Sequence, residues 1–284
     1  MPGINQDNHA HSGPIGIFDS GYGGLTIFRA IADELPEYDY IYLGDNARAP
    51  YGNRSFETVY EYTLECVRWF FRQNCPLVIL ACNTASAKAL RTIQQNDLPG
   101  MAPDRRVLGV IRPSAEIIGQ HTMTGSVGIL GTKGTVTSES YPIEIGHFYP
   151  DIRVYQQACP LWVPFIESGD YLDDTMDIHI RKDLDALFAQ SPDIDTVLLA
   201  CTHYPLIEHK IRKYLPPGVK LVSQGTIVSH SLADYLHRHP DMERRLSRGG
   251  MKTFWTTDSV SDFEEHASQF FGERVKATHT HLVS

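Results

Sequence analysis

Residues 77–84 read LVILACNT and residues 196–203 read TVLLACTH. Each segment is a short apolar run without polar alternation, followed by Ala-Cys and then by small polar side chains. Continuous Val/Ile/Leu runs are typical of strands buried on both faces of a parallel sheet. Ligands of open α/β sheets bind at the carboxyl ends of such strands, where Cys82 and Cys201 would lie. The two segments therefore predict an α/β fold with a cysteine at the ligand-binding end of each strand.

The rest of the chain alternates in the same way between short apolar runs and longer amphipathic stretches. The predicted strands are 15–18, 40–43, 77–81, 107–110, 127–130, 154–156, 196–200 and 220–222. Helical periodicity predicts helices between them, among them 25–35, 56–74, 86–95 and 178–190. This alternation of strands and helices favours an α/β fold with mainly parallel sheets.

Part of the sequence is repeated in a degenerate form. Residues 15–18 (IGIF) resemble residues 127–130 (VGIL), 112 residues later, and both runs enter turns rich in Gly, Ser and Thr. The two cysteine segments are 119 residues apart and follow in the same order. Chance similarity between strands would explain one such pair, but two pairs with similar offsets favour two copies of one unit. Two such units would place equivalent strand ends on opposite sides of one cleft.

Composition restricts the class of protein. A chain of 284 residues suits one large domain or two of about 140 residues each. The net charge of −9 argues against a nucleic-acid partner, because phosphate binding needs a basic face. No apolar run approaches the ~18 residues that a membrane helix requires. Residues 1–13 lack the apolar centre of a signal peptide and are predicted to form a flexible tail.

The cysteines indicate a reducing compartment. Cys66, Cys75, Cys82, Cys159 and Cys201 are odd in number and include no Cys-x-x-Cys pair. This usage favours free thiols in the cytoplasm over a disulfide framework. Cys66 and Cys75 fall in or just after a predicted helix and Cys159 precedes a proline, so these three are predicted to be structural.

Cys82 and Cys201 are candidates for chemistry as a pair. Either one alone is better explained as a small buried hydrophobe. Together they share a strand end and are each followed by hydrogen-bonding side chains, a setting that can lower the pKa of a thiol. Zinc binding is a weak alternative because a second close ligand pair is missing. Nucleophilic Cys–His catalysis with His203 is a better alternative, although its orienting third group is unassigned.

Two glycine-rich loops follow the repeated strands. Residues 19–26 read DSGYGGLT, which fits neither the Rossmann nor the Walker spacing, and Asp19 would repel a phosphate. An aspartate there better suits a substrate ammonium group or the support of a thiol. Residues 131–137 read GTKGTVT, lack an acid and contain Lys133, so an anion could bind there. A tight turn with only a structural role stays open for both loops.

Five motifs occur along the chain in a fixed order. They are FDSGYGGL (18–25), GD (44–45) with PYG (50–52), ACNTAS (81–86), ACPL (158–161) with Val163, Pro164 and Glu167, and ACTHYP (200–205). In this order they resemble the motifs of glutamate racemases, in the aspartate/glutamate racemase family. Each motif alone is moderately specific, whereas five in order are highly specific. The resemblance covers residues 13–272, nearly the whole chain.

The resemblance implies two pseudo-symmetric α/β domains with mainly parallel sheets and the active site in the cleft between them. It divides the chain into the tail 1–13, a first domain of 14–108 plus 222–284, and a second domain of 109–221. The implied activity is racemisation of L-glutamate to D-glutamate without a cofactor or metal, which would supply D-glutamate for peptidoglycan synthesis. Arg112, in the segment IRPS (111–114), departs from the family's usual motif and leaves regulation and subunit contacts open.

The resemblance also implies roles for individual residues. The implied catalytic residues are Cys82 and Cys201 as paired proton donor and acceptor, Asp19 and His203 as their assistants, and Glu167 in support of His203. The implied substrate-binding residues are Asp19, Ser20, Tyr51, Gly52, Asn83, Thr84, Thr202 and His203, with Thr132 and Thr135 also reaching the substrate. The chemistry agrees independently, because inversion at Cα without a cofactor requires a base on one face and an acid on the other. No lysine has the setting of a pyridoxal phosphate site, and Lys88 is expected at the surface.

Two further functions compete with this interpretation. One is racemisation of a related substrate, such as aspartate or hydantoin, in the same superfamily. The other is a two-lobed small-molecule binding protein of the periplasmic type, which the missing export signal argues against. The expected partners are a small-molecule substrate and a second copy of the chain in a homodimer.

Overall fold

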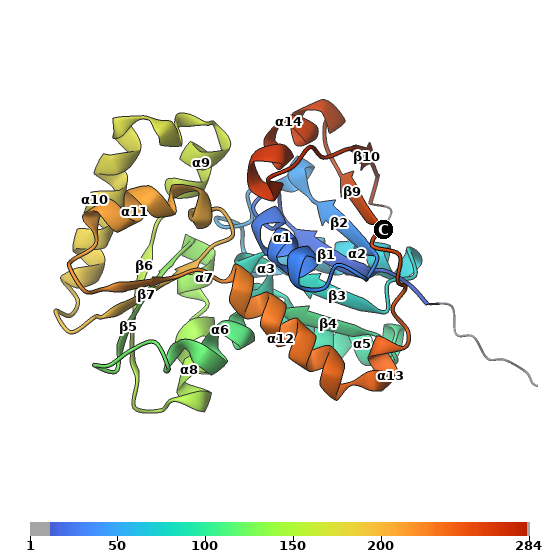
Figure 1. Ribbon diagram of the computed structural model, residues 1–284, viewed down its shortest axis with the longest axis horizontal. Helices are drawn as coiled ribbons and strands as arrows, with labels where there is room; N and C mark the ends of the chain where they lie inside the picture. Colours follow the sequence, from blue (N-terminus) through green and yellow to red (C-terminus); the bar gives the residue numbers. More distant parts are fainter. Residues whose placement is uncertain (1–11, 283–284) are drawn as a thin grey trace, which may run out of the picture.

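The computed structural model describes residues 12–282, so nearly all of the predicted tail 1–13 lies outside the described residues. The described chain forms two separate sheets with helices packed around them (Figure 1). Every pair of neighbouring strands in both sheets is parallel. The predicted α/β class with mainly parallel sheets is therefore confirmed.

The first sheet has six strands in the order β10-β9-β2-β1-β3-β4. Their bounds are β1 Ile15–Asp19, β2 Tyr40–Gly44, β3 Leu77–Leu80, β4 Arg106–Gly109, β9 Lys252–Thr256 and β10 Ala277–His279. The second sheet has four strands in the order β6-β5-β7-β8. Their bounds are β5 Ser126–Gly131, β6 Arg153–Ala158, β7 Thr196–Ala200 and β8 Lys220–Val222. The order β2-β1-β3-β4 is repeated as β6-β5-β7-β8, which is the order that two copies of one unit would give.

The central strands account for the continuous apolar runs. Every residue of β1, β3, β5 and β7 is buried. A strand covered by neighbours on both edges and by helices on both faces has no side exposed to water, so alternation disappears. All eight predicted strands are confirmed to within one or two residues at each end.

Strands β9 and β10 were missed. In β9 the first two residues are exposed, and no residue of β10 is buried. Short strands with exposed residues lack a long apolar run and so give little signal in the sequence. They extend the first sheet beyond β2, which brings the C-terminal part of the chain back to the N-terminal part (Figure 1).

The helices differ from the predictions mainly after Cys82. Their bounds are α1 Leu25–Glu34, α2 Phe56–Arg72, α3 Asn83–Lys88, α4 Leu90–Thr92, α5 Leu98–Met101, α6 Ile111–Ile118, α7 Lys133–Thr137, α8 Ser140–Phe148, α9 Trp162–Glu167, α10 Asp174–Phe188, α11 Glu208–Tyr214, α12 Gly225–Arg238, α13 Pro240–Glu243 and α14 Val260–Phe271. The helix predicted at 86–95 begins earlier, at Asn83, because the Cys82 thiol accepts a hydrogen bond from the Ala85 N–H and caps it. It then breaks into α3, α4 and a π-helical turn at Ile93–Asp97.

The chain crosses between the sheets twice, after β4 and after β8. We propose that the two domains divide at these crossings, after Gly109 and after Val222. The boundaries expected from the sequence, after residues 108 and 221, each lie one residue earlier. None of the helices in residues 12–282 combines the length and the apolar character needed to span a membrane.

Candidate active site

Cys82 lies two residues after the end of β3 and caps helix α3. Its side chain is 5% exposed, and its sulfur lies 3.5 Å from the Ala85 nitrogen and 3.6 Å from the Ser20 hydroxyl, to which the thiol donates. Burial, followed by the nearby Asp19 carboxylate, raises the pKa of Cys82 to about 12. In this arrangement Cys82 carries its proton at neutral pH and is suited to donate it.

Cys201 holds the equivalent place in the second sheet, directly after β7. It is 6% exposed, and its sulfur lies 3.9 Å from Nδ1 of His203. The other ring nitrogen of His203 lies 2.9 Å from a carboxylate oxygen of Glu167, at the end of α9. The family resemblance implied that Glu167 supports His203, and in the structure the two side chains are in contact.

His203 is charged in this setting. Burial alone would lower its pKa, but the hydrogen bonds to Cys201 and Glu167 outweigh burial and raise the pKa to about 10. A protonated imidazole therefore stands beside Cys201 at neutral pH and can stabilise a thiolate there. The two sulfurs face opposite electrostatic surroundings, with a cation next to Cys201 and a carboxylate near Cys82.

Asp19 lies behind the site. It is fully buried at the end of β1. Its carboxylate accepts hydrogen bonds from the Gly21 N–H at 2.9 Å and from the Thr202 hydroxyl at 3.4 Å. Burial raises the pKa of Asp19, while His203 and the bonds from the Gly21 and Gly24 N–H groups act in the opposite direction. Asp19 links the two halves of the site through Thr202 but does not line the cavity described next.

A small cavity separates the two thiols. Its volume is about 40 Å³, which is space for only a few water molecules. Ten of the predicted site residues line it: Ser20, Tyr51, Gly52, Cys82, Asn83, Thr84, Glu167, Cys201, Thr202 and His203. Thr132 also lines it, whereas Thr135 is fully buried behind Thr132 with their hydroxyls 3.1 Å apart. The carboxyl ends of equivalent strands from the two sheets thus meet at one cavity.

Two loops close over this cavity from opposite sheets. The Gly134 N–H donates to the Gly52 carbonyl at 2.8 Å, and the hydroxyls of Thr84 and Thr132 are 3.0 Å apart. The Tyr51 hydroxyl is already paired with Asp45. The first two contacts join the two sides of the cavity.

Lys88 supports one of these loops and is not at the surface, so that expectation was wrong. It is 9% exposed, and its ammonium group donates to the Arg54 carbonyl at 2.7 Å. Burial lowers its pKa. Its buried stem ties helix α3 to the loop that carries Tyr51 and Gly52.

The sequence missed part of the cavity wall. Cys159, Pro160 and Val163 line it, although Cys159 had been predicted to be only structural. Burial, followed by the charge of Asp183, raises the pKa of Cys159 well above that of a free thiol, so it forms an inert wall. The signal for its position was its place directly after β6, at the carboxyl end of a parallel strand. Among residues 12–282, no three His, Cys, Asp or Glu side chains are grouped as metal ligands.

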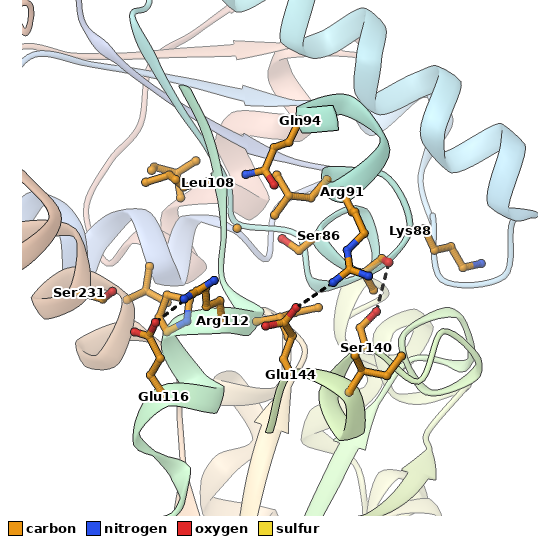
Figure 2. Close-up of a pocket in the computed structure, with 18 of the residues that line it drawn as sticks. Ser86, Lys88, Arg91, Gln94, Leu108, Arg112, Glu116, Ser140, Glu144 and Ser231 are labelled. Carbon is orange, nitrogen blue, oxygen red and sulfur yellow. Dashed lines mark hydrogen bonds and ion pairs between the residues drawn. The ribbon is translucent and has the colours of Figure 1, made fainter. Parts of the chain in front are cut away.

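A second and larger cavity, of about 730 Å³, contains neither thiol. It lies where α3, α4 and β4 approach α6, α8 and α12, and Figure 2 shows two ion pairs within it. Arg91 lies 3.6 Å from Glu144, and Arg112 lies 3.0 Å from Glu116. This places Arg112, the departure from the family's motif, away from the two cysteines.

Comparison with known proteins identifies the family. The profile of the Asp/Glu/Hydantoin racemase family matches residues 24–229. A glutamate racemase of Dinoroseobacter shibae is 38% identical, over 92% of this chain and 97% of the relative. A glutamate racemase isoform of Bacillus anthracis superimposes with a TM-score of 0.86 at 32% identity, covering 95% of this chain and 98% of that one. The glutamate racemase of Francisella tularensis in complex with D-glutamate superimposes with a TM-score of 0.84 at 30% identity, covering 95% of this chain and 98% of that one. The chain therefore belongs to the Asp/Glu/hydantoin racemase family and, like the glutamate racemases it matches, is an amino-acid racemase.

Proposed function

We propose that the protein interconverts L- and D-glutamate by a two-base mechanism that uses Cys82 and Cys201. The observation that carries the proposal is the placement of the two thiols at equivalent strand ends, one from each sheet, around a single cavity. The choice of glutamate is supported by relatives named glutamate racemase that are 35–43% identical over most of the chain.

In the proposed reaction a Cys201 thiolate removes the α-proton of L-glutamate, so that a C–H bond breaks and an S–H bond forms. The Cys82 thiol gives its proton to the opposite face of Cα, which leaves Cys82 as a thiolate and yields D-glutamate. The reverse reaction exchanges the two roles, as microscopic reversibility demands. The protonated His203 beside Cys201 and the high pKa of Cys82 suit this starting state.

The remaining residues of the cavity bind and orient the substrate in this proposal. Ser20, Tyr51, Gly52, Asn83, Thr84, Thr202 and His203 hold the carboxylates and the ammonium group. Asp19 lies behind the cavity wall and acts on the site through its hydrogen bond from Thr202 and its electrostatic interaction with His203. Fixed donors in a closed cavity stabilise the carbanion electrostatically without a cofactor.

We further propose that the product supplies peptidoglycan synthesis, and hence cell-wall formation and cell shape, in the cytoplasm. The five cysteines are free, which fits a reducing compartment. A homodimer belongs to the same proposal and is tested by sedimentation of the purified protein.

The experiment that tests the function incubates the purified protein with L-glutamate and, separately, with L-aspartate, without pyridoxal phosphate. Enantiomers are then resolved by chiral chromatography. D-glutamate formation with little D-aspartate supports the proposal. Formation of D-aspartate alone would favour the related-substrate alternative, and formation of neither would contradict glutamate as the substrate.

Removal of metals and carbonyl cofactors is expected to leave the activity intact. The proposed chemistry passes only through thiols and fixed hydrogen-bond donors, so neither EDTA nor hydroxylamine removes a reacting group. Glutamate racemisation is measured after dialysis against each reagent. Activity that returns only on addition of zinc or pyridoxal phosphate would contradict the mechanism.

His203→Asn is expected to change the pH profile as well as the rate. The pKa of His203 is raised to about 10, so its positive charge is present below that pH and is lost above it. Racemisation by the native protein should fall as the pH rises through about 10, and the variant should lack this step. The variant should lose on the order of 100-fold in kcat/KM at neutral pH, the lower end of the range for acid–base groups and less than either cysteine variant. If the variant still loses activity as the pH rises through about 10, His203 is not the group whose deprotonation causes that loss.

A further inference from the structure

Asn83 takes part in a closed ring of three hydrogen bonds. Its Nδ2 donates to Oε1 of Gln224 at 2.7 Å, and Nε2 of Gln224 donates to the Tyr141 hydroxyl at 2.8 Å. The Tyr141 hydroxyl donates to Oδ1 of Asn83 at 2.6 Å, which completes the ring. All three side chains are at least 98% buried, so each bond is shielded from competing water.

The direction of each bond follows from the surrounding donors. Ser114 donates its hydroxyl hydrogen to the Val110 carbonyl at 2.9 Å, so it can only accept from Nε2 of Gln224, 2.7 Å away. This fixes which end of the Gln224 amide is the nitrogen, and the ring then fixes the Asn83 amide. One hydrogen on Nδ2 of Asn83 is left over, and Asn83 lines the catalytic cavity.

The ring joins distant parts of the chain. Asn83 begins α3 next to Cys82, and Tyr141 lies in α8 beside the second sheet. Gln224 lies on the segment that crosses back from the second sheet to α12, and Ser114 lies in α6 after the other crossing. The orientation of one cavity residue is thus tied to both crossings.

We propose that Tyr141 and Gln224 are positioning residues, which orient Asn83 so that its free N–H faces a substrate carboxylate. A carboxylate accepts hydrogen bonds only, so an amide turned to present its oxygen would repel it. Without the Tyr141 hydroxyl, Oδ1 of Asn83 loses its donor, and only the bond from Nδ2 to Gln224 is left to hold the amide in this orientation. The effect on substrate binding rests on the proposed racemisation of glutamate.

Tyr141→Phe tests this role by removing one oxygen atom. We expect KM for glutamate to rise about five- to twentyfold, with kcat within about threefold of the native value, since the lost interaction concerns binding. In an Asn83→Ala background the same change should alter KM less than about twofold, because the residue it positions is gone. Tyr149→Phe is the matched control: its hydroxyl donates to the Glu116 carbonyl at 2.7 Å outside the catalytic cavity, and KM should not change.

A second measurement does not depend on activity. In protein labelled with ¹⁵N-asparagine, the side-chain NH₂ of Asn83 should exchange slowly with solvent, and this protection should be lost in Tyr141→Phe but kept in Tyr149→Phe. Unchanged protection or unchanged KM in a folded Tyr141→Phe variant overturns the inference, as do additive effects with Asn83→Ala. A native protein that fails to racemise glutamate counts against the proposed function, and the ¹⁵N signals then still decide whether Tyr141 holds Asn83.

Discussion

Replacing either cavity cysteine, by Cys82→Ser or Cys201→Ser, is expected to lower glutamate racemisation at least ~100-fold. An alcohol is a far weaker acid and base than a thiol at neutral pH, and each direction of the reaction needs both groups. Rates are measured in both directions by chiral chromatography. Cys75→Ser is the matched control, because Cys75 is also a buried free thiol but does not line the cavity.

Solvent deuterium distinguishes two bases from one in the native protein. Starting from L-glutamate in D₂O, new D-glutamate should carry deuterium at Cα from the first turnover, because the proton comes from a different sulfur than the one that accepted the original proton. The remaining L-glutamate should stay largely protiated early on. Protium carried into early D-glutamate, or near-normal turnover by either serine variant, would refute the assignment of the two thiols.

Gly23→Ala is expected to reduce racemisation by ~100-fold without contacting the substrate. A methyl group at Gly23 would lie 2.3 Å from the Thr202 hydroxyl and 2.4 Å from Nδ1 of His203. His203 cannot move away easily, since its two nitrogens are engaged by Cys201 and Glu167. A shift of about 1 Å in an acid/base group can cost ~100-fold in rate.

The control for this prediction is Gly146→Ala. A methyl group at Gly146 meets no atom within 4 Å, so this change tests the effect of alanine substitution alone. Both variants are compared in kcat/KM and in the midpoint of thermal unfolding. Native-like activity of a folded Gly23→Ala variant would mean that the His203 side of the cavity tolerates displacement, and the proposed role of His203 would weaken.

Tertiary structure determined several positions that the local sequence pattern did not predict. Asp19, expected to assist a thiol and to bind the substrate, lies behind Thr202 and is not among the residues that line the small cavity. Lys88 had been expected at the surface, but it is buried beneath the loop of Tyr51 and Gly52. Helical periodicity could not reveal this, because the apolar stem of a lysine can be buried wherever the tertiary structure offers its ammonium group a polar partner, here the Arg54 carbonyl.

What the sequence determined by itself is eight of the ten strands in residues 12–282, their parallel pairing and the two strand ends that carry Cys82 and Cys201. Buried parallel strands need continuous apolar residues, and a run of four or five residues is long enough to show this pattern in the sequence. Strands β9 and β10 left no such signal, and the place of Cys159 directly after β6 was not recognised as part of the cavity wall. The fit of Gly23 against His203 and the ring around Asn83 were decided only by the tertiary structure. Their partners lie far apart in the chain, and which atoms meet depends on how the two sheets pack against each other.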